Sequence, residues 1–87
     1  MTNDTLILYS KPGCHLCEGL QEKLEQTQTL DFQLEVRDIT QRDDWFQAYQ
    51  YQVPVLCYHK DGKETPLPRP SPRLSVPQLE KMLQKYL

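Results

Sequence analysis

Apolar and polar residues follow one another along this chain with two different spacings, which predict alternating strands and helices. Residues 5–9 are a short and almost continuous apolar run, which is typical of a central strand buried on both faces. A helix is predicted to begin near His15, because leucines recur every fourth residue among polar ones, at Leu16, Leu20 and Leu24. Phe32, Leu34 and Val36 alternate with polar residues, which predicts a second strand with one buried face.

The middle of the chain predicts a second helix over residues 40–50. Thr40 is expected to cap this helix, and Asp43 and Asp44 suit its first turn, where the positive end of the helix dipole favours acidic side chains. The apolar stripe of this helix is expected to pack in the core and consists of Trp45, Phe46 and Tyr49.

A hairpin and a final helix are predicted in the last third of the chain. Residues 53–58 form a strand, and Asp61-Gly62 is a hairpin signal, so residues 63–67 are expected to return antiparallel. Alternate prolines then exclude a helix, at Pro66, Pro68, Pro70 and Pro72. Ser75 and Gln78 form a capping box, with Pro77 tolerated in the first turn. The expected buried face of this helix consists of Val76, Leu79, Met82, Leu83 and Tyr86.

The predicted element order is therefore β-α-β-α-β-β-α, in a single domain of 87 residues, 1–87. The first two strands require a parallel crossover, which should be right-handed. A net charge of −2 predicts neither a nucleic-acid partner nor an acidic membrane partner. No apolar run approaches the ~20 residues of a membrane span, and residues 1–4 show no sign of a secretory signal.

Three cysteines are an odd number, whereas a small secreted domain is usually held by several disulfides. We therefore expect a reducing, cytoplasmic location. Cys14 and Cys17 form a C-x-x-C pair where the first helix is predicted to begin. Unpaired N–H groups and the helix dipole stabilise a thiolate there, and the thiolate is the species that attacks disulfides. The third cysteine, Cys57, reads as a small buried hydrophobe.

Roles for the pair follow from their positions. Cys14 is the first residue of the pair and should be the more exposed and more acidic thiol, and hence the nucleophile. Cys17 lies one turn deeper and should resolve the mixed disulfide. A structural pair or half of a zinc site are the alternatives, although the spacing of the cysteines and histidines matches no common zinc pattern. Leu16, between the two cysteines, is expected to pack in the core.

The element order, the segment 9–17 and the dipeptide Val53-Pro54 resemble the thioredoxin fold in its minimal glutaredoxin form, and in particular a group of small bacterial glutaredoxin-like proteins. The resemblance implies an α/β fold with a four-stranded mixed sheet flanked by three helices. It implies a cis bond at Val53-Pro54, with the Val53 backbone pairing with glutathione or a protein segment. It also implies that Lys11 contacts a carboxylate of glutathione, and that His15 tunes Cys14. For these last two residues, a solvated lysine and an exposed histidine without a role are the alternatives.

One departure from the glutaredoxin pattern bears on glutathione. The family's Gly-Gly turn, where the γ-glutamyl end of glutathione binds, is replaced here by residues 69–75, which carry Arg69 and Arg73. The backbone N–H groups of the last helix would still receive a carboxylate. Whether glutathione binds without the Gly-Gly turn is left open.

Three functions are compatible with these residues. The first is a monomeric dithiol oxidoreductase that acts on protein or glutathione mixed disulfides, with electrons returned by glutathione or a thioredoxin-type reductase. It would hold no tightly bound cofactor and no metal. The second is a glutathione-dependent iron–sulfur or metal carrier that uses Cys14. The third is a non-catalytic module that binds peptides beside Pro54.

Overall fold

A computed structural model describes residues 4–28 and 30–87 of the chain. Met1, Thr2 and Asn3, where no secretory signal is expected, lie outside the described residues. The strands are β1 (Thr5–Ser10), β2 (Gln33–Asp38), β3 (Val55–Lys60) and β4 (Lys63–Pro66). The helices are α1 (His15–Glu25), α2 (Asp43–Tyr49) and α3 (Val76–Leu83), with a short 3₁₀ turn, η1 (Ile39–Gln41). No helix in the described part of the chain is long and apolar enough to cross a membrane.

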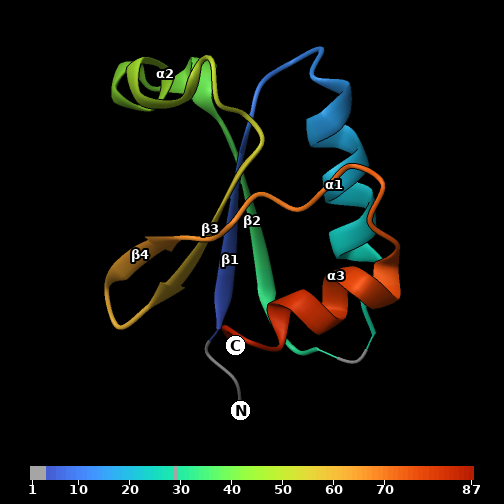
Figure 1. Cartoon of the computed structure of the whole chain (residues 1–87). Coiled ribbons are helices and arrows are strands. Elements are labelled where there is room, and N and C mark those ends of the chain that lie inside the picture. The colour runs from blue at the N-terminus through green and yellow to red at the C-terminus, as the bar shows by residue number, and fades with distance from the viewer. Residues whose placement is uncertain (1–3, 29) are drawn as a thin grey trace.

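The four strands form one mixed sheet in the order β2-β1-β3-β4 (Figure 1). Strand β1 pairs in parallel with β2 and antiparallel with β3, and β3 pairs antiparallel with β4. The prediction of a mixed four-stranded sheet with three helices, in the order β-α-β-α-β-β-α, is confirmed. The inner position of β1 explains why its residues are almost all apolar.

Helices α1 and α3 lie on one face of this sheet and enclose the larger core (Figure 1). The buried leucines of this core come from β1, β3, α1, α3 and the residue directly after β4: Leu6, Leu8, Leu20, Leu24, Leu56, Leu67, Leu79 and Leu83. Successive residues of a strand point to opposite faces. The residues of β1 that alternate with these leucines, Ile7 and Tyr9, therefore pack on the other face.

The second core lies on that other face and is covered by η1 and α2. Ile39 and Cys57 are buried in it, and the predicted stripe of Trp45, Phe46 and Tyr49 packs against it. Cys57 is only 1% exposed, which confirms that it acts as a small buried hydrophobe. The two cysteines of the C-x-x-C pair lie at the start of α1, so Cys57 and the pair belong to different parts of the molecule.

Arg42 divides the segment that was predicted to be one helix over residues 40–50. Its backbone is extended (φ −139°, ψ 131°) and separates η1 from α2. Thr40 is not the helix cap: the carboxylate of Asp38 accepts a hydrogen bond of 2.9 Å from the Thr40 N–H and so caps η1. Asp43 and Asp44 do lie in the first turn of α2, as predicted.

Three apolar residues are more exposed than their spacing predicts. Val36 is 41% exposed, because β2 is an edge strand whose outer part is left uncovered. Tyr86 follows the end of α3 and is 38% exposed. Leu16 is 53% exposed and does not pack in the core, because it lies in the first turn of α1.

Strand β3 begins at Val55, rather than at residue 53 as its sequence predicted.

The local signals for turns and caps are confirmed. Asp61 (φ 54°) and Gly62 (φ 80°) both have positive φ, as a type I′ hairpin turn requires. Ser75 and Gln78 form the complete capping box at the start of α3, with bonds of 3.3 and 3.0 Å. These elements set the ends of β3, β4 and α3.

Candidate functional site

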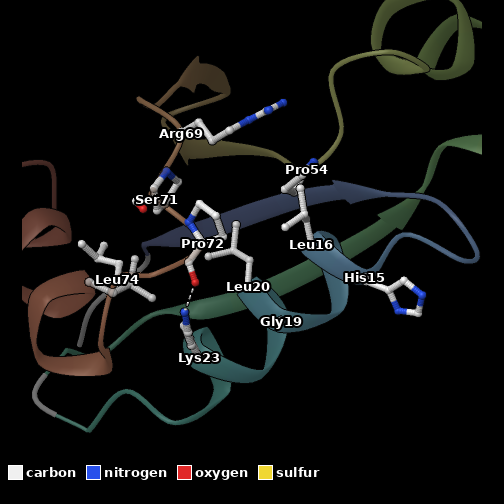
Figure 2. Close-up of a pocket in the computed structure, with 12 residues that line it drawn as sticks. His15, Leu16, Gly19, Leu20, Lys23, Pro54, Arg69, Ser71, Pro72 and Leu74 are labelled. Carbon is white, nitrogen blue, oxygen red and sulfur yellow. Dashed lines mark hydrogen bonds between the residues drawn. The ribbon is translucent and has the colours of Figure 1, made fainter.

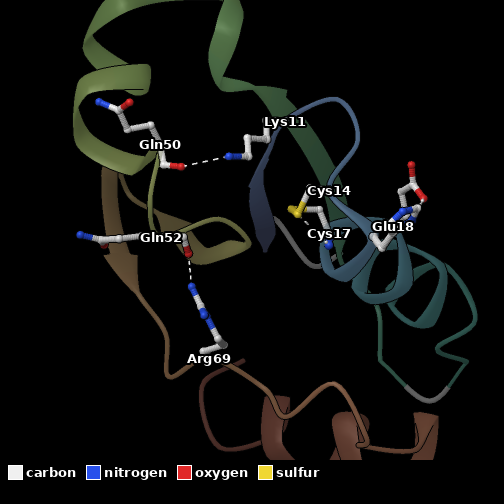
Figure 3. The surroundings of a disulfide bond; sticks show 8 residues. Lys11, Cys14, Cys17, Glu18, Gln50, Gln52 and Arg69 are labelled. Atoms are coloured by element: carbon white, nitrogen blue, oxygen red, sulfur yellow. Dashed lines mark hydrogen bonds and ion pairs between the residues drawn. A yellow bond between two sulfur atoms is a disulfide. The ribbon is translucent and has the colours of Figure 1, made fainter.

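The C-x-x-C pair lies where β1 ends and α1 begins. Cys14 and Cys17 are joined as a disulfide, and their Cα atoms are 5.3 Å apart, which is within the usual range for a disulfide (Figure 3). Gly13 has a positive φ of 80°, a conformation that glycine adopts at little cost, and it turns the chain from the strand into the helix. Cys14 is the N-cap residue of α1.

A backbone donor at the helix start points to the sulfur of Cys14. The Cys17 N–H donates to Cys14 Sγ at 3.2 Å, so the cysteine occupies the place that a serine or aspartate oxygen takes in most helix caps. Cys14 is half-buried, whereas Cys17 is 2% exposed. The predicted difference in exposure between the two cysteines is therefore confirmed, and the sulfur at the helix start is the accessible one.

His15 lies beside the pair but is directed into solvent. Its side chain is 94% exposed, and its Nδ1 lies 3.6 Å from a carboxylate oxygen of Glu18. The ring points away from the core side of α1 (Figure 2). The contact that the structure gives to His15 is thus an exposed one with the Glu18 carboxylate, and surface contacts of this kind contribute little to stability.

The loop before β3 is held from two directions. Lys11 Nζ donates to the carbonyl oxygen of Gln50 at 3.2 Å, and the guanidinium of Arg69 donates to the carbonyl oxygen of Gln52 (Figure 3). The loop then passes into the Val53–Pro54 peptide bond, which is cis. Lys11 and Arg69 therefore fix the backbone just before Val53. The sequence did not predict either of these two contacts with backbone carbonyl groups.

A groove runs along the exposed side of α1, between this helix and the loop that joins β4 to α3 (Figure 2). We call it the α1 groove. It has a volume of about 190 Å³ and is lined by His15, Leu16, Gly19, Leu20, Lys23, Pro54, Arg69, Pro70, Ser71, Pro72, Leu74 and Leu79. His15 and Leu16 are the two residues between the cysteines, so the groove begins directly beside the disulfide. Neither this groove nor the place of Leu16 and Lys23 in it is predicted from the sequence.

One signal in the sequence would have indicated the groove. The last strand and the last helix are joined by residues 67–75, which are too rich in proline to form a helix and long enough to pass over α1. Lys23 Nζ donates to the Pro72 carbonyl oxygen at 2.7 Å and ties this connector to α1. Leu16, at the exposed start of the helix, then forms part of the wall.

Cys57 differs chemically from the cysteines at this site. Burial raises the pKa of its thiol from 9.0 to about 11; the negative charge of Glu64 adds to this rise, and the positive charge of Arg37 partly opposes it. A thiol in that environment is protonated at neutral pH and is a poor nucleophile. Within residues 4–28 and 30–87, no three His, Cys, Asp or Glu side chains gather so that they would hold a metal ion.

The architecture and the cysteine pair define a thioredoxin-fold protein. The model of the glutaredoxin-like domain family (DUF836) matches residues 5–84, and the chain belongs to that family. None of the curated proteins is significantly similar to the chain in sequence.

Solved structures agree with this assignment. The structural-genomics target protein XcR50 from X. campestris is 29% identical, with a TM-score of 0.63 over 94% of this chain and 99% of that one. Mitochondrial thioredoxin 3 from Saccharomyces cerevisiae, in its oxidized form, is 19% identical, with a TM-score of 0.67 over 98% of this chain and 80% of that one. The second likeness is one of fold.

Proposed function

We propose that this protein is a dithiol oxidoreductase that reduces disulfides through Cys14 and Cys17. The observation that carries the proposal is the position of Cys14 Sγ at the N-cap of α1, where it accepts the Cys17 N–H. In the reduced protein the same N–H and the positive end of the helix dipole stabilise a thiolate at this sulfur. Partial exposure of Cys14 gives a substrate access to it.

In the first step, the Cys14 thiolate attacks one sulfur of a substrate disulfide. A new S–S bond joins Cys14 to the substrate, and the other substrate sulfur leaves as a thiolate. The disulfide to be attacked is a protein disulfide or a mixed disulfide with glutathione. The backbone of Val53, fixed by Lys11 and Arg69 through the preceding loop, pairs with the extended segment that carries the substrate sulfur.

In the second step, Cys17 loses its proton to solvent and attacks the Cys14 sulfur of the mixed disulfide. The substrate leaves as a second thiolate, and the Cys14–Cys17 disulfide forms. Two electrons have then passed from the two protein thiols to the substrate disulfide. The Cα separation of 5.3 Å is compatible with this closure without backbone movement. Two glutathione thiols or a thioredoxin-type reductase would return the electrons, in a reducing compartment such as the cytoplasm.

The start of α3 argues for a protein substrate over glutathione. Glutaredoxins resembling this chain would bind the γ-glutamyl end of glutathione near this helix. Here the capping box uses the N–H groups of Ser75 and Gln78, and Pro77 has none. Few backbone donors are therefore left for a carboxylate. Glutathione fits better as the reductant of the Cys14–Cys17 disulfide than as part of the preferred substrate.

Single cysteine variants test the proposal. The wild type should reduce a mixed-disulfide peptide, Cys14→Ser should be inactive, and Cys17→Ser should stop as a mixed disulfide that mass spectrometry detects. The Cys57→Ala variant, which leaves the C-x-x-C pair intact, is the matched control. At pH 6, where a free cysteine of pKa ~8.5 is almost fully protonated, Cys14 should still react with iodoacetamide. Activity in Cys14→Ser would refute the nucleophile assignment, and binding without turnover in the wild type would favour a non-catalytic module.

A further inference from the structure

The lining of the α1 groove carries positive charge and no carboxylate. Among the lining residues, Lys23 and Arg69 are the cations, and none is Asp or Glu. Figure 2 shows Arg69 and Pro54 toward one end of the groove and Lys23 toward the other. The whole chain has a net charge of −2, so this positive rim is a local feature. A ligand that fits this rim carries negative charge.

Neither cation is neutralised by the contact that fixes it. Lys23 Nζ donates to the Pro72 carbonyl oxygen and Arg69 donates to the Gln52 carbonyl oxygen, and both acceptors are uncharged backbone groups. An ammonium group has three N–H donors and a guanidinium has five. Both side chains are therefore held in place and keep donors for a carboxylate.

The interior of the groove is apolar and of limited size. Leu16, Leu20, Leu74 and Leu79 contribute aliphatic surface, and prolines contribute the rest of the far wall. A cavity of about 150 Å³ accommodates a benzene ring, so a volume of about 190 Å³ accommodates one side chain of the size of Leu or Phe. Glutathione has two carboxylates but no such side chain.

We propose that the α1 groove binds the polypeptide that flanks the substrate disulfide, with one large apolar side chain between α1 and residues 70–74 and one carboxylate side chain at Arg69. This inference rests on the proposed function, and it names the substrate class of the same site. Leu16 lies between the two cysteines and also lines the groove. A peptide whose cysteine is bonded to Cys14 therefore passes directly into it.

Cysteine peptides linked by a disulfide to a chromogenic thiol test the inference, since exchange releases the coloured thiol. Leu and Glu are placed in turn at the two positions on each side of the cysteine, and each is compared with Ser and Gln. In the best placement, Leu should raise kcat/KM over Ser about tenfold, as expected from burial of its side chain. Glu should raise it over Gln about two- to fivefold, and added salt should remove that second preference.

Two groove variants separate the two contributions. Arg69→Gln should abolish the preference for Glu over Gln and keep the preference for Leu. Leu16→Ser should reduce the preference for Leu over Ser and keep the preference for Glu. Lys63→Gln, a substitution of an exposed lysine in β4 that does not line the groove, is the matched control and should keep both preferences. Each preference is the ratio of the kcat/KM values of two peptides measured on the same variant. A change in the reactivity of the Cys14 thiol affects both values equally and therefore cancels.

Failure of the inference and failure of the proposed function give different results. If the wild type exchanges with no peptide and with no glutathione mixed disulfide, the proposed function is wrong. If it exchanges with all peptides at equal rates, only the assignment of the groove is wrong. If Arg69→Gln and Leu16→Ser slow exchange with the glutathione mixed disulfide as much as with the best peptide, the groove is a glutathione site, which also overturns the inference.

Discussion

At the scale of single residues, the three cysteines show how position determines the chemistry of one side chain. Cys14 ends a loop and caps α1, so a backbone N–H points to its sulfur. Cys17 is one turn further along the helix and is 2% exposed. Cys57 is buried against Ile7, Tyr9 and Ile39 on the opposite face of the sheet. The first two form the disulfide, and the third is held as a neutral thiol.

The buried thiol of Cys57 makes stability depend on pH in alkaline solution. Its pKa is raised from 9.0 to about 11 in the folded protein, so between these pH values the unfolded chain loses this proton and the folded chain keeps it. The free energy of unfolding therefore falls as pH rises from 9 to 11. The expected contribution is about 1–3 kcal/mol, at ~1.36 kcal/mol for each pKa unit.

Urea denaturation of the oxidised protein at pH 8 and pH 11 measures this effect. In the oxidised form Cys14 and Cys17 do not titrate. The Cys57→Ala variant, although less stable at pH 8, should lose less stability between the two pH values than the wild type. The tyrosines are the same in both proteins, so their titration cancels in the comparison. Equal losses would show that the Cys57 thiol does not carry the effect.

At the scale of elements, the helix starts differ in whether and how a side chain caps them. A cysteine caps α1, and the capping box of Ser75 and Gln78 begins α3. Asp38 caps the short turn η1, and no side chain caps α2 at Arg42. The prediction of a single helix over residues 40–50 was wrong at its start: the stripe of Trp45, Phe46 and Tyr49 lies wholly after Arg42, whose backbone is extended.

The capping box of α3 has a measurable energy. Ser75→Ala removes the side-chain acceptor for the Gln78 N–H and should lower the free energy of unfolding by about 1 kcal/mol. Ser75→Thr keeps a hydroxyl at this position and should retain most of the stability. Thermal or urea unfolding followed by circular dichroism measures both variants. An unchanged stability in Ser75→Ala would mean that packing of Leu79 and Leu83 alone determines where α3 begins.

At the scale of the whole molecule, the sheet separates two cores that are covered by different helices (Figure 1). A polar cluster joins the strands at the edge of the second core. The Tyr9 hydroxyl donates to Glu64 at 2.7 Å and accepts from Arg37 at 2.8 Å, and Arg37 also donates to Glu64 at 2.8 Å. These bonds connect β1, β2 and β4. Burial and Glu64 raise the pKa of Tyr9, so its hydroxyl stays protonated.

The larger core should supply most of the stability. Leu8 is fully buried between α1, α3 and the sheet, and Leu8→Ala should cost about 2–5 kcal/mol through lost burial and a cavity. Val36→Ala is the matched control, because Val36 is a strand residue that is 41% exposed and should cost much less. Urea denaturation of both variants provides the comparison. If both variants lost a similar amount of unfolding free energy, Leu8 would contribute no more to stability than the exposed Val36, and the prediction would be wrong.

The sequence by itself determined the order of the elements, the hairpin turn, the capping box and the position of the cysteine pair at the start of a helix. These features depend on residues within a few positions of one another, so spacing and residue type are enough to predict them. The glutaredoxin-like class followed from the same local motifs. The identity of the nucleophile stays a prediction, and the helix cap at Cys14 supports it.

Only the tertiary structure decided which surface surrounds that pair. The α1 groove lies between α1 and the connector before α3, where Lys23 bonds to Pro72, 49 positions away, and Lys11 bonds to Gln50, 39 positions away, in the loop before Val53. Leu16 has the spacing of a core residue, yet it lies where α1 extends beyond the covering elements and is left exposed. Contacts between distant segments produce no regular spacing of residues in the sequence. The groove and its charge could therefore be identified only in the folded chain.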